Sequence, residues 1–392
     1  MNSLRRATVV YVAAALQGFA FTLVPALATV FADAPYTISP QAFGQLFITL
    51  TAGAIVAAVS AAFLARRVGT FGVLRLGVAA NVLGLVALVA SSAIHGSGAY
   101  ALLLIDTTAL GLGFGLNFSA VNELASTLGT NETRSVTVAN VLTGLGTALT
   151  PLLLAALIAH GVWIAWPIVL IVLFCAVVAA SIGLRQAKLP TETAEPRKPG
   201  AGMRTLALFG VTALLYALCE GTFSSWTTTF AHGERHLSLA IGEAALAGFW
   251  LALTAARILG ALTARVLRPR PALVVFPLAI AAALLLLPLP QSDGWFIAAF
   301  VFAGVACSVV FPYAMSLALA ALPSLGDRVA GVLVGALMTG EGIGTFAIGA
   351  LHAHGMPLAT IYRWSSLVAL ALAIAAALAV RSSPASAVKT SR

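Results

Sequence analysis

The sequence predicts an all-α integral membrane protein in which twelve transmembrane helices form two six-helix halves. The prediction rests on composition, on the number of long apolar runs and on one polar break at the centre of the chain. Of the 392 residues, 60% are hydrophobic and only 8% are charged, whereas about 25% of the residues in a soluble protein are charged. This composition excludes an ordinary soluble enzyme.

The expected spans are apolar runs of about 20 residues, the length that an α-helix needs to cross a hydrocarbon core of about 30 Å. Short polar or Gly- and Pro-containing breaks separate them. The first run has no small-residue cleavage site, so we expect a retained helix rather than a signal peptide. The twelve runs are residues 7–31, 41–64, 73–93, 99–127, 135–160, 163–184, 205–230, 239–263, 272–290, 294–320, 329–352 and 358–380.

The longest break is rich in Pro, Thr, Glu and Lys and lies between the sixth and seventh runs. It divides the chain into an N-terminal half at 1–185, a linker at 186–203, a C-terminal half at 204–382 and a tail at 383–392. Six spans in each half give both halves the same orientation, as in parallel repeats. A Thr-Gly-X-Gly sequence recurs in the fifth and eleventh spans, at 143–146 and 339–342.

The basic residues set the expected orientation. Lys and Arg gather at alternate breaks, for example at Arg5, at Arg66 and Arg67, at Arg134 and throughout the central linker. Because cytoplasmic loops carry an excess of Lys and Arg, both termini and the linker are expected in the cytoplasm. The net charge of +9 is therefore interpreted as topology, and nucleic acid is not an expected partner. We expect a multi-pass protein of a plasma membrane, the bacterial inner membrane.

The six-plus-six pattern, the linker and a basic turn at 65–72 (ARRVGTFG) resemble the major facilitator superfamily of secondary transporters. The turn lacks the aspartate that is usual in the superfamily's loop signature. Three segments resemble its fucose and glucose permease branch: GFG and SAVN at 113–122, residues 220–226 with 249–260, and SVVFP at 308–312. Two acids of the branch's proton symporters are absent, because the first span has FTLVP at 21–25 and the fourth span has Phe118.

The resemblance implies that the first, fourth, seventh and tenth spans line a central cavity, and so places two intramembrane acids near the transport pathway. Glu220 lies in the seventh span and Asp106 in the fourth. A charged side chain at the bilayer centre costs at least about 2.5–3.5 kcal/mol on insertion scales, so each should face a cavity or a partner. We expect Glu220, surrounded by apolar residues, to couple transport to protons, with Asp106 second. A structural carboxylate that bonds to a neighbouring helix is the alternative.

A second pair of charges lies inside the expected spans. Arg257 in the eighth span and Glu341 in the eleventh are expected at depths that differ by only about 5 Å. Opposite charges left apart in lipid would each be costly, so we predict that they form a structural or gating ion pair. Direct contact with substrate is the alternative.

The expected substrate-binding residues are uncharged polar and aromatic side chains. Amide and hydroxyl groups hydrogen-bond to a polyol, and an aromatic face stacks on it. Polar residues also hold membrane helices together, so packing is an equally open interpretation for each of them. The set is Gln17, Asn117, Asn122, Trp226, Trp250, Ser308 and Tyr313.

These features predict a secondary active transporter that moves a small organic solute by alternating access. We expect proton-coupled uptake of a sugar or related polar solute by a monomer; the alternative is proton-driven efflux of an amphiphilic compound. A channel is a further alternative, and the two-half architecture favours a carrier. No P-loop or nucleophile-base motif indicates an enzyme. The widely spaced Cys175, Cys219 and Cys307 predict neither disulfides nor a metal site, and no cofactor is expected.

Overall fold

The computed structural model describes residues 2–128, 132–185, 202–262, 268–289, 292–323, 325 and 327–383, and these contain helices and turns but no strand. Eleven of the described helical segments are long and apolar enough to cross a membrane, and one shorter apolar helix completes the predicted set of twelve. The expected linker lies outside the described residues except for 202 and 203, and the tail lies outside them except for 383.

The first six spans contain eight helices because the first span is broken near Thr22 and Leu27. They are α1 (Asn2–Phe21), α2 (Leu23–Ala26), α3 (Ala28–Ala32), α4 (Pro40–Val68), α5 (Thr70–Ser91), α6 (Ser97–Ser126), α7 (Glu132–Ala159) and α8 (Ala165–Ser181). Ser39 caps α4, since its hydroxyl accepts a hydrogen bond from the Ala42 amide and Pro40 occupies the first helical position.

The last six spans begin with α9 (Met203–Thr229), which continues into the π-helix η1 (Phe230–Glu234). The tenth span is also broken, between α12 and α13. The remaining helices are α10 (Leu239–Leu262), α11 (Pro269–Leu286), α12 (Asp293–Cys307), α13 (Val310–Ala321), α14 (Asp327–Ala353) and α15 (Leu358–Ser382).

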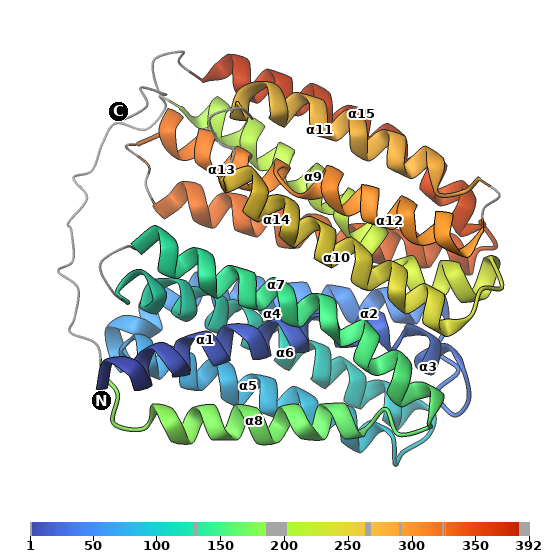
Figure 1. The fold of residues 1–392 in the computed structure, drawn as a ribbon, viewed down its shortest axis with the longest axis horizontal. Helices are drawn as coiled ribbons and strands as arrows, with labels where there is room; N and C mark the ends of the chain where they lie inside the picture. The colour runs from blue at the N-terminus through green and yellow to red at the C-terminus, as the bar shows by residue number, and fades with distance from the viewer. Residues whose placement is uncertain are drawn as a thin grey trace.

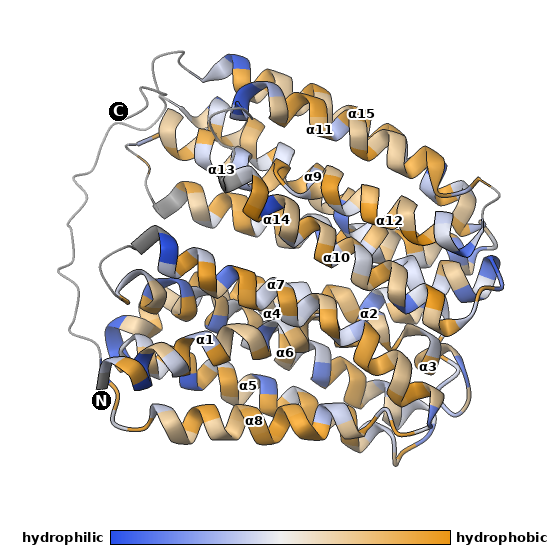
Figure 2. Cartoon of the chain, in the orientation of Figure 1, coloured by the Kyte–Doolittle hydropathy of each residue, from blue (hydrophilic) through white to orange (hydrophobic). Residues whose placement is uncertain are grey.

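Helices α1 to α8 lie together on one side of the molecule and α9 to α15 on the other (Figure 1). The start of α1 and the end of α15 lie at one end of the bundle, which we call the basic end because it carries Arg5, Arg66 and Arg67; the opposite end is the far end. Arg5 donates to the carbonyls of Ala180 and Ile182, which ties the start of α1 to the end of α8. Figure 2 shows hydrophobic residues along most of the helix length and hydrophilic residues mainly near the ends, as a membrane-spanning bundle requires.

Small residues let the helices approach closely within each half. A Cβ atom at Gly111 of α6 would lie 1.9 Å from the Leu50 carbonyl oxygen of α4. The recurring Thr-Gly-X-Gly sequence has the same role in both halves. In α7, Gly146 faces α1 of its own half and Gly144 faces Thr254 across the interface; in α14, Gly340 faces α9 and Gly342 faces Thr51 across the interface. Each copy therefore packs its own half and also contacts the other.

The two halves meet tightly at the far end. The Thr228 hydroxyl of α9 donates to the Pro25 carbonyl at 3.2 Å. The rings of Phe43 in α4 and Trp226 in α9 meet edge to face with centroids 5.4 Å apart. A Cβ atom at Gly349 of α14 would lie 2.4 Å from the Pro40 carbonyl oxygen. These contacts close the interface between the halves at the far end.

Candidate functional site

A cavity of about 530 Å³ lies between the two halves. Its lining comes from α1, α6 and α7 on one side and from α9, α10, α13 and α14 on the other. The lining reaches Val136 in the second turn of α7 and Gly260 near the end of α10, both towards the basic end. The lining thus extends towards the basic end, whereas the halves are in contact at the far end.

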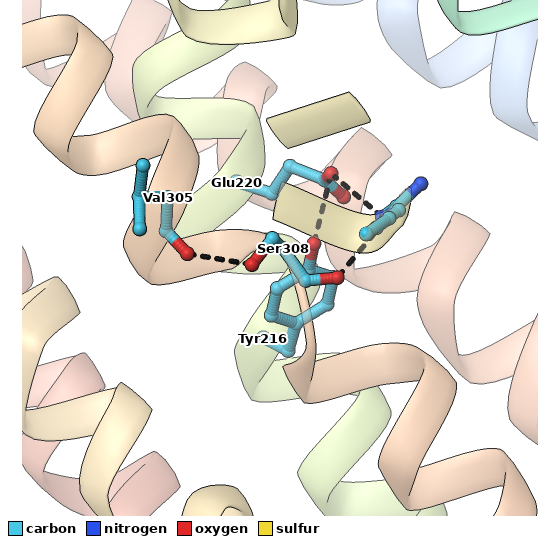
Figure 3. A network of polar contacts seen from close by, with 5 residues as sticks. Tyr216, Glu220, Val305 and Ser308 are labelled. Carbon is cyan, nitrogen blue, oxygen red and sulfur yellow. Dashed lines mark hydrogen bonds and ion pairs between the residues drawn. The ribbon is translucent and has the colours of Figure 1, made fainter. Parts of the chain in front are cut away.

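A cluster of charged and hydroxyl groups lies in the wall formed by the C-terminal half (Figure 3). Tyr216 and Glu220 are one turn apart on α9, so their side chains share a face of the helix. The Tyr216 hydroxyl donates to Glu220 Oε1 at 2.9 Å. Arg257 of α10 forms an ion pair with the same oxygen, with an Nη2 to Oε1 distance of 3.9 Å.

The break between α12 and α13 provides an acceptor for Arg257. Pro312 has no N–H, so the carbonyl of Ser308, four residues earlier, has no helical donor. Arg257 Nε donates to this carbonyl at 3.0 Å, and the Ser308 hydroxyl donates to Val305 at 2.7 Å (Figure 3). The backbone of the tenth span therefore fixes the guanidinium beside Glu220.

The structure gives Arg257 a different partner from the one we predicted. Among the described residues, its ion pair is with Glu220 and not with Glu341. Glu341 nevertheless lines the same cavity and is within electrostatic range of Glu220. Its Cγ would lie 3.6 Å from a Cβ atom at Gly221, so α14 brings it against α9. Equal depth is necessary for pairing but does not fix which face of each helix carries the side chain, and here α9 presents the nearer carboxylate.

Three of the predicted substrate-binding residues, Trp250, Ser308 and Tyr313, line the cavity. Asn122 lies beside it, where its side-chain oxygen accepts a hydrogen bond at 3.0 Å from Asn140, which is itself a lining residue. The binding role of these residues stays a prediction.

Gln17 and Asn117 are instead part of a buried amide cluster that packs the N-terminal half. The side-chain amides of Asn81 and Asn117 both donate to Gln17 Oε1, at 2.8 and 3.0 Å. Neither Gln17 nor Asn117 lines the large cavity; both line a much smaller void beside Asn122 and Asn140. In this conformation they hold α1, α5 and α6 together, which is the packing alternative left open by the sequence.

Asp106 and Trp226 lie away from the cavity. Asp106 is completely buried in α6, and its carboxylate oxygens have no hydrogen-bond partner within the part of the chain that the structure describes. Trp226 is buried at the far end, where its ring lies between those of Phe43 and His352. The ring centroids of Trp226 and His352 are 6.3 Å apart. Trp226 thus belongs to the contacts that close the far end.

Three phenylalanine side chains that we did not predict as site residues, Phe21, Phe114 and Phe118, form the wall on the N-terminal side. The Trp250, Phe21, Phe114 and Phe118 rings follow one another with centroids 5.9, 5.0 and 5.5 Å apart. All four line the cavity. The sequence contains a signal for two of them, since Phe21 and Phe118 occur where the resembling symporters have an acidic segment or residue. Tyr216 was also missed, because its role depends on its partner Glu220.

Two further observations concern charged residues outside this cluster. Glu243, close to the start of α10, is buried, and its carboxylate oxygens also have no hydrogen-bond partner among the described residues. We did not single it out because it lies near the end of its span. No group of three or more His, Cys, Asp or Glu side chains suited to a metal ion occurs in the described ranges.

The family model described as Major Facilitator Superfamily matches residues 7–350 of the chain. No curated protein matches the sequence. Among solved structures, the fold is similar to that of the nucleoside transporter NupG, with a TM-score of 0.73 and 12% identity over 97% of this chain and 100% of that one. It is also similar to the E. coli fucose:proton symporter FucP, with a TM-score of 0.67 and 16% identity over 97% and 99%. A structure of FucP in the outward conformation gives a TM-score of 0.66 at 15% identity, over 97% and 98%.

Proposed function

Because the chain belongs to the Major Facilitator Superfamily and is a multi-pass membrane transporter, we propose that it couples the movement of a small organic solute to protons through Glu220. The observation that carries this proposal is the position of Glu220 in the cavity wall, bonded to Tyr216 and paired with Arg257. A carboxylate with a cationic partner inside the membrane is stable in two states, paired and ionised or unpaired and protonated. Proton coupling requires such a pair of states.

Alternating access is supported by the asymmetry of the two ends. The cavity reaches the basic end, whereas at the far end the halves are joined by the Thr228 hydrogen bond and the ring contact of Trp226 with Phe43. The far-end contacts join α4 and the Pro25 segment of one half to α9 and α14 of the other, and rocking of one half against the other would exchange which end is closed. If the basic end is cytoplasmic, as the positive-inside rule implies, this conformation faces inward.

A sugar or related polar solute is the first candidate substrate. Trp250 and Tyr313 offer aromatic faces, and Asn140 with several threonines offers hydrogen-bonding groups. The fucose:proton symporter FucP has a similar fold. Proton-coupled uptake from outside a bacterial inner membrane by a monomer is the corresponding function, since the cavity is complete within one chain.

An amphiphilic compound that is exported in exchange for protons is the second candidate. It is favoured by the row of Phe21, Phe114 and Phe118, and by the withdrawal of Gln17 and Asn117 into helix packing. Phenylalanine rings bury the apolar area of a ligand, but they have no polar atom that could donate to or accept from a sugar hydroxyl. They therefore suit an amphiphilic compound better than a sugar.

Counterflow in proteoliposomes tests the function and separates the candidates. Proteoliposomes that contain the purified protein are loaded with one unlabelled compound from a panel of hexoses and hydrophobic cations. Entry of the same compound in labelled form is then followed with and without a pH gradient. We expect saturable, pH-driven exchange for one class and none in empty vesicles. Solute flux that neither saturates nor shows exchange would indicate a channel and contradict the proposal.

A further inference from the structure

We propose that the cavity is a binding site for an organic monoanion, a carboxylate with an aromatic or otherwise apolar body, which Arg257 binds in place of Glu220. This inference deepens the proposed function and rests on it. It comes from the juxtaposition of one accessible guanidinium in the C-terminal wall and a row of aromatic rings in the opposite wall.

Arg257 is the only cationic side chain among the described residues that line the cavity. Its side chain is 40% exposed, whereas that of Glu220 is 14% exposed, so a solute in the cavity meets the guanidinium before the carboxylate. The guanidinium is also held in place from behind, because its Nε donates to the Ser308 carbonyl. A cation fixed in this way presents its remaining N–H groups in one direction.

The Nη groups of Arg257 form no hydrogen bond within the part of the chain that the structure describes. The Nη2 to Oε1 distance of 3.9 Å is an ion pair but is longer than a hydrogen bond. Within the described residues, the one hydrogen bond of the guanidinium is that of Nε to Ser308. The two Nη groups together carry four N–H donors. A carboxylate accepts two parallel hydrogen bonds from such a fork, and these charge-assisted bonds are stronger than neutral ones.

The opposite wall suits the rest of such a molecule. Phe21, Phe114 and Phe118 come from α1 and α6, and the ring of Trp250 connects their row to α10, the helix that also carries Arg257. An aromatic or alkyl body packed on these rings removes apolar surface from water. The volume of about 530 Å³ is within the range of about 300–1,000 Å³ for small-molecule sites. A polar head at Arg257 and an apolar body on the rings thus occupy the two walls together.

Exchange of partners at Arg257 also links the anion to a proton. When the solute carboxylate pairs with Arg257, Glu220 loses its cationic neighbour, and an unpaired carboxylate is costly in this site. Glu220 then takes one proton from the solution at the open end. When the anion leaves, the proton leaves Glu220 and the original pair re-forms. One anion and one proton therefore move together. The net charge of the site is zero in both states: Arg257 balances ionised Glu220 in the empty site, and it balances the solute carboxylate when Glu220 is protonated.

Other titratable groups lie near Glu220 and could affect its protonation. They are Tyr216 on the same helix, Arg257 on α10, Cys307 on α12 and Glu341 on α14. Glu341 is the one that could instead favour a cation, because two carboxylates near one arginine give an excess of negative charge when both are ionised. A cationic solute is accordingly the outcome that opposes this inference.

The test compares three probes with the same body and different heads: phenylbutyrate, phenylbutyramide and phenylbutylamine. Binding to the purified full-length protein is measured by calorimetry in two buffers of different ionisation enthalpy, which also reports proton uptake. We expect phenylbutyrate to bind at least about tenfold more tightly than the amide or the amine, with uptake of a proton. Butyrate, which lacks the ring, should bind more weakly than phenylbutyrate.

Variants separate charge recognition from folding. Arg257→Gln should abolish the preference for the carboxylate, and the double variant with Glu220→Gln should do so as well without leaving an unpaired charge. Glu220→Gln alone should bind phenylbutyrate without proton uptake, and Glu341→Gln should keep the preference. Arg363→Gln, which changes an exposed arginine of α15, is the matched control and should behave as the unmodified protein.

The inference is overturned if the amine binds most tightly, if all three probes bind equally, if none binds, or if Arg257→Gln keeps the carboxylate preference. Its failure is distinguishable from failure of the proposed function. If a hexose or a hydrophobic cation shows pH-driven exchange while phenylbutyrate does not bind, the carrier stands and the anion site does not. If phenylbutyrate binds with proton uptake but no solute is exchanged across the vesicle membrane, the transport proposal fails instead.

Discussion

The carboxylate of Glu220 and the guanidinium of Arg257 lie 3.9 Å apart across the interface between α9 and α10, in the wall of the central cavity. Both charges sit inside apolar helices, and each has one further fixed contact, Glu220 with Tyr216 and Arg257 with the Ser308 carbonyl. Because the two charged groups are not hydrogen-bonded to each other and each has another partner, the ion pair can separate without disturbing the helices that carry it.

A double-mutant cycle measures this interaction. Arg257→Gln and Glu220→Gln each leave one charge without its partner, whereas the double variant leaves none. We expect a coupling free energy of about 1 kcal/mol, below that of a fully buried pair because Arg257 is 40% exposed. Thermal unfolding in detergent provides the measurement. The same cycle with Glu341→Gln tests the partner that we predicted from depth alone; a larger coupling there would make Glu341 the dominant partner.

Glu220→Gln tests proton coupling. The amide keeps the size of the side chain and can still accept from Tyr216, but it does not titrate. We expect loss of accumulation driven by a pH gradient, while exchange of bound solute remains measurable in proteoliposomes. Asp106→Asn, at a buried site away from the cavity, is the comparison variant. Undiminished pH-driven accumulation in the Glu220 variant would assign that residue a structural role.

Trp226→Ala tests the closure of the far end. The change removes the edge-to-face contact with Phe43, and such pairs contribute about 0.5–1.5 kcal/mol beyond buried area. We expect more molecules to open at the far end, by about fivefold per 1 kcal/mol lost. The readout is the labelling rate of a cysteine at the buried position Ser224, probed from the far end. Trp364→Ala, on an exposed face of α15, should leave the rate unchanged.

Gly111→Ala tests the close approach of α4 and α6. The added Cβ atom would lie 1.9 Å from the Leu50 carbonyl oxygen, so the two backbones must separate. We expect a loss of about 1–3 kcal/mol, visible as a lower unfolding temperature. Gly335→Ala in α14 is the control, because a Cβ atom there meets nothing within 4 Å. Equal unfolding temperatures for the two variants would contradict this packing.

Cysteine labelling tests the orientation. In a background with Cys175, Cys219 and Cys307 replaced, a cysteine at Val68, the exposed last residue of α4, should react only from the cytoplasm. One at His232, exposed beyond α9, should react only from outside. The expectation follows from the positive-inside rule. Labelling of Val68→Cys by an impermeant reagent added outside intact cells would reverse the assigned orientation.

The twelve spans could be predicted from the sequence because crossing a bilayer is a local requirement on length and hydropathy. The predicted runs at 41–64 and 73–93 correspond to α4 and α5, with ends that differ by a few residues, because an apolar run does not fix the residue at which a helix begins or ends. The breaks at Thr22 and at Ser308 were not predicted, because each interrupts an apolar run without changing its hydropathy.

The membership of the candidate site depends on tertiary structure. Glu220, Arg257 and Glu341 could be recognised from the sequence as charges within membrane spans, and a charge there is costly whichever way its helix is rotated. The sequence did not indicate that Arg257 faces Glu220, that Asn81 and Asn117 both donate to Gln17, or that Trp226 joins the far-end contacts. Those relationships depend on which face each helix turns towards its neighbours, and that is decided by packing of small residues such as Gly111 and Gly340 between helices far apart in the chain.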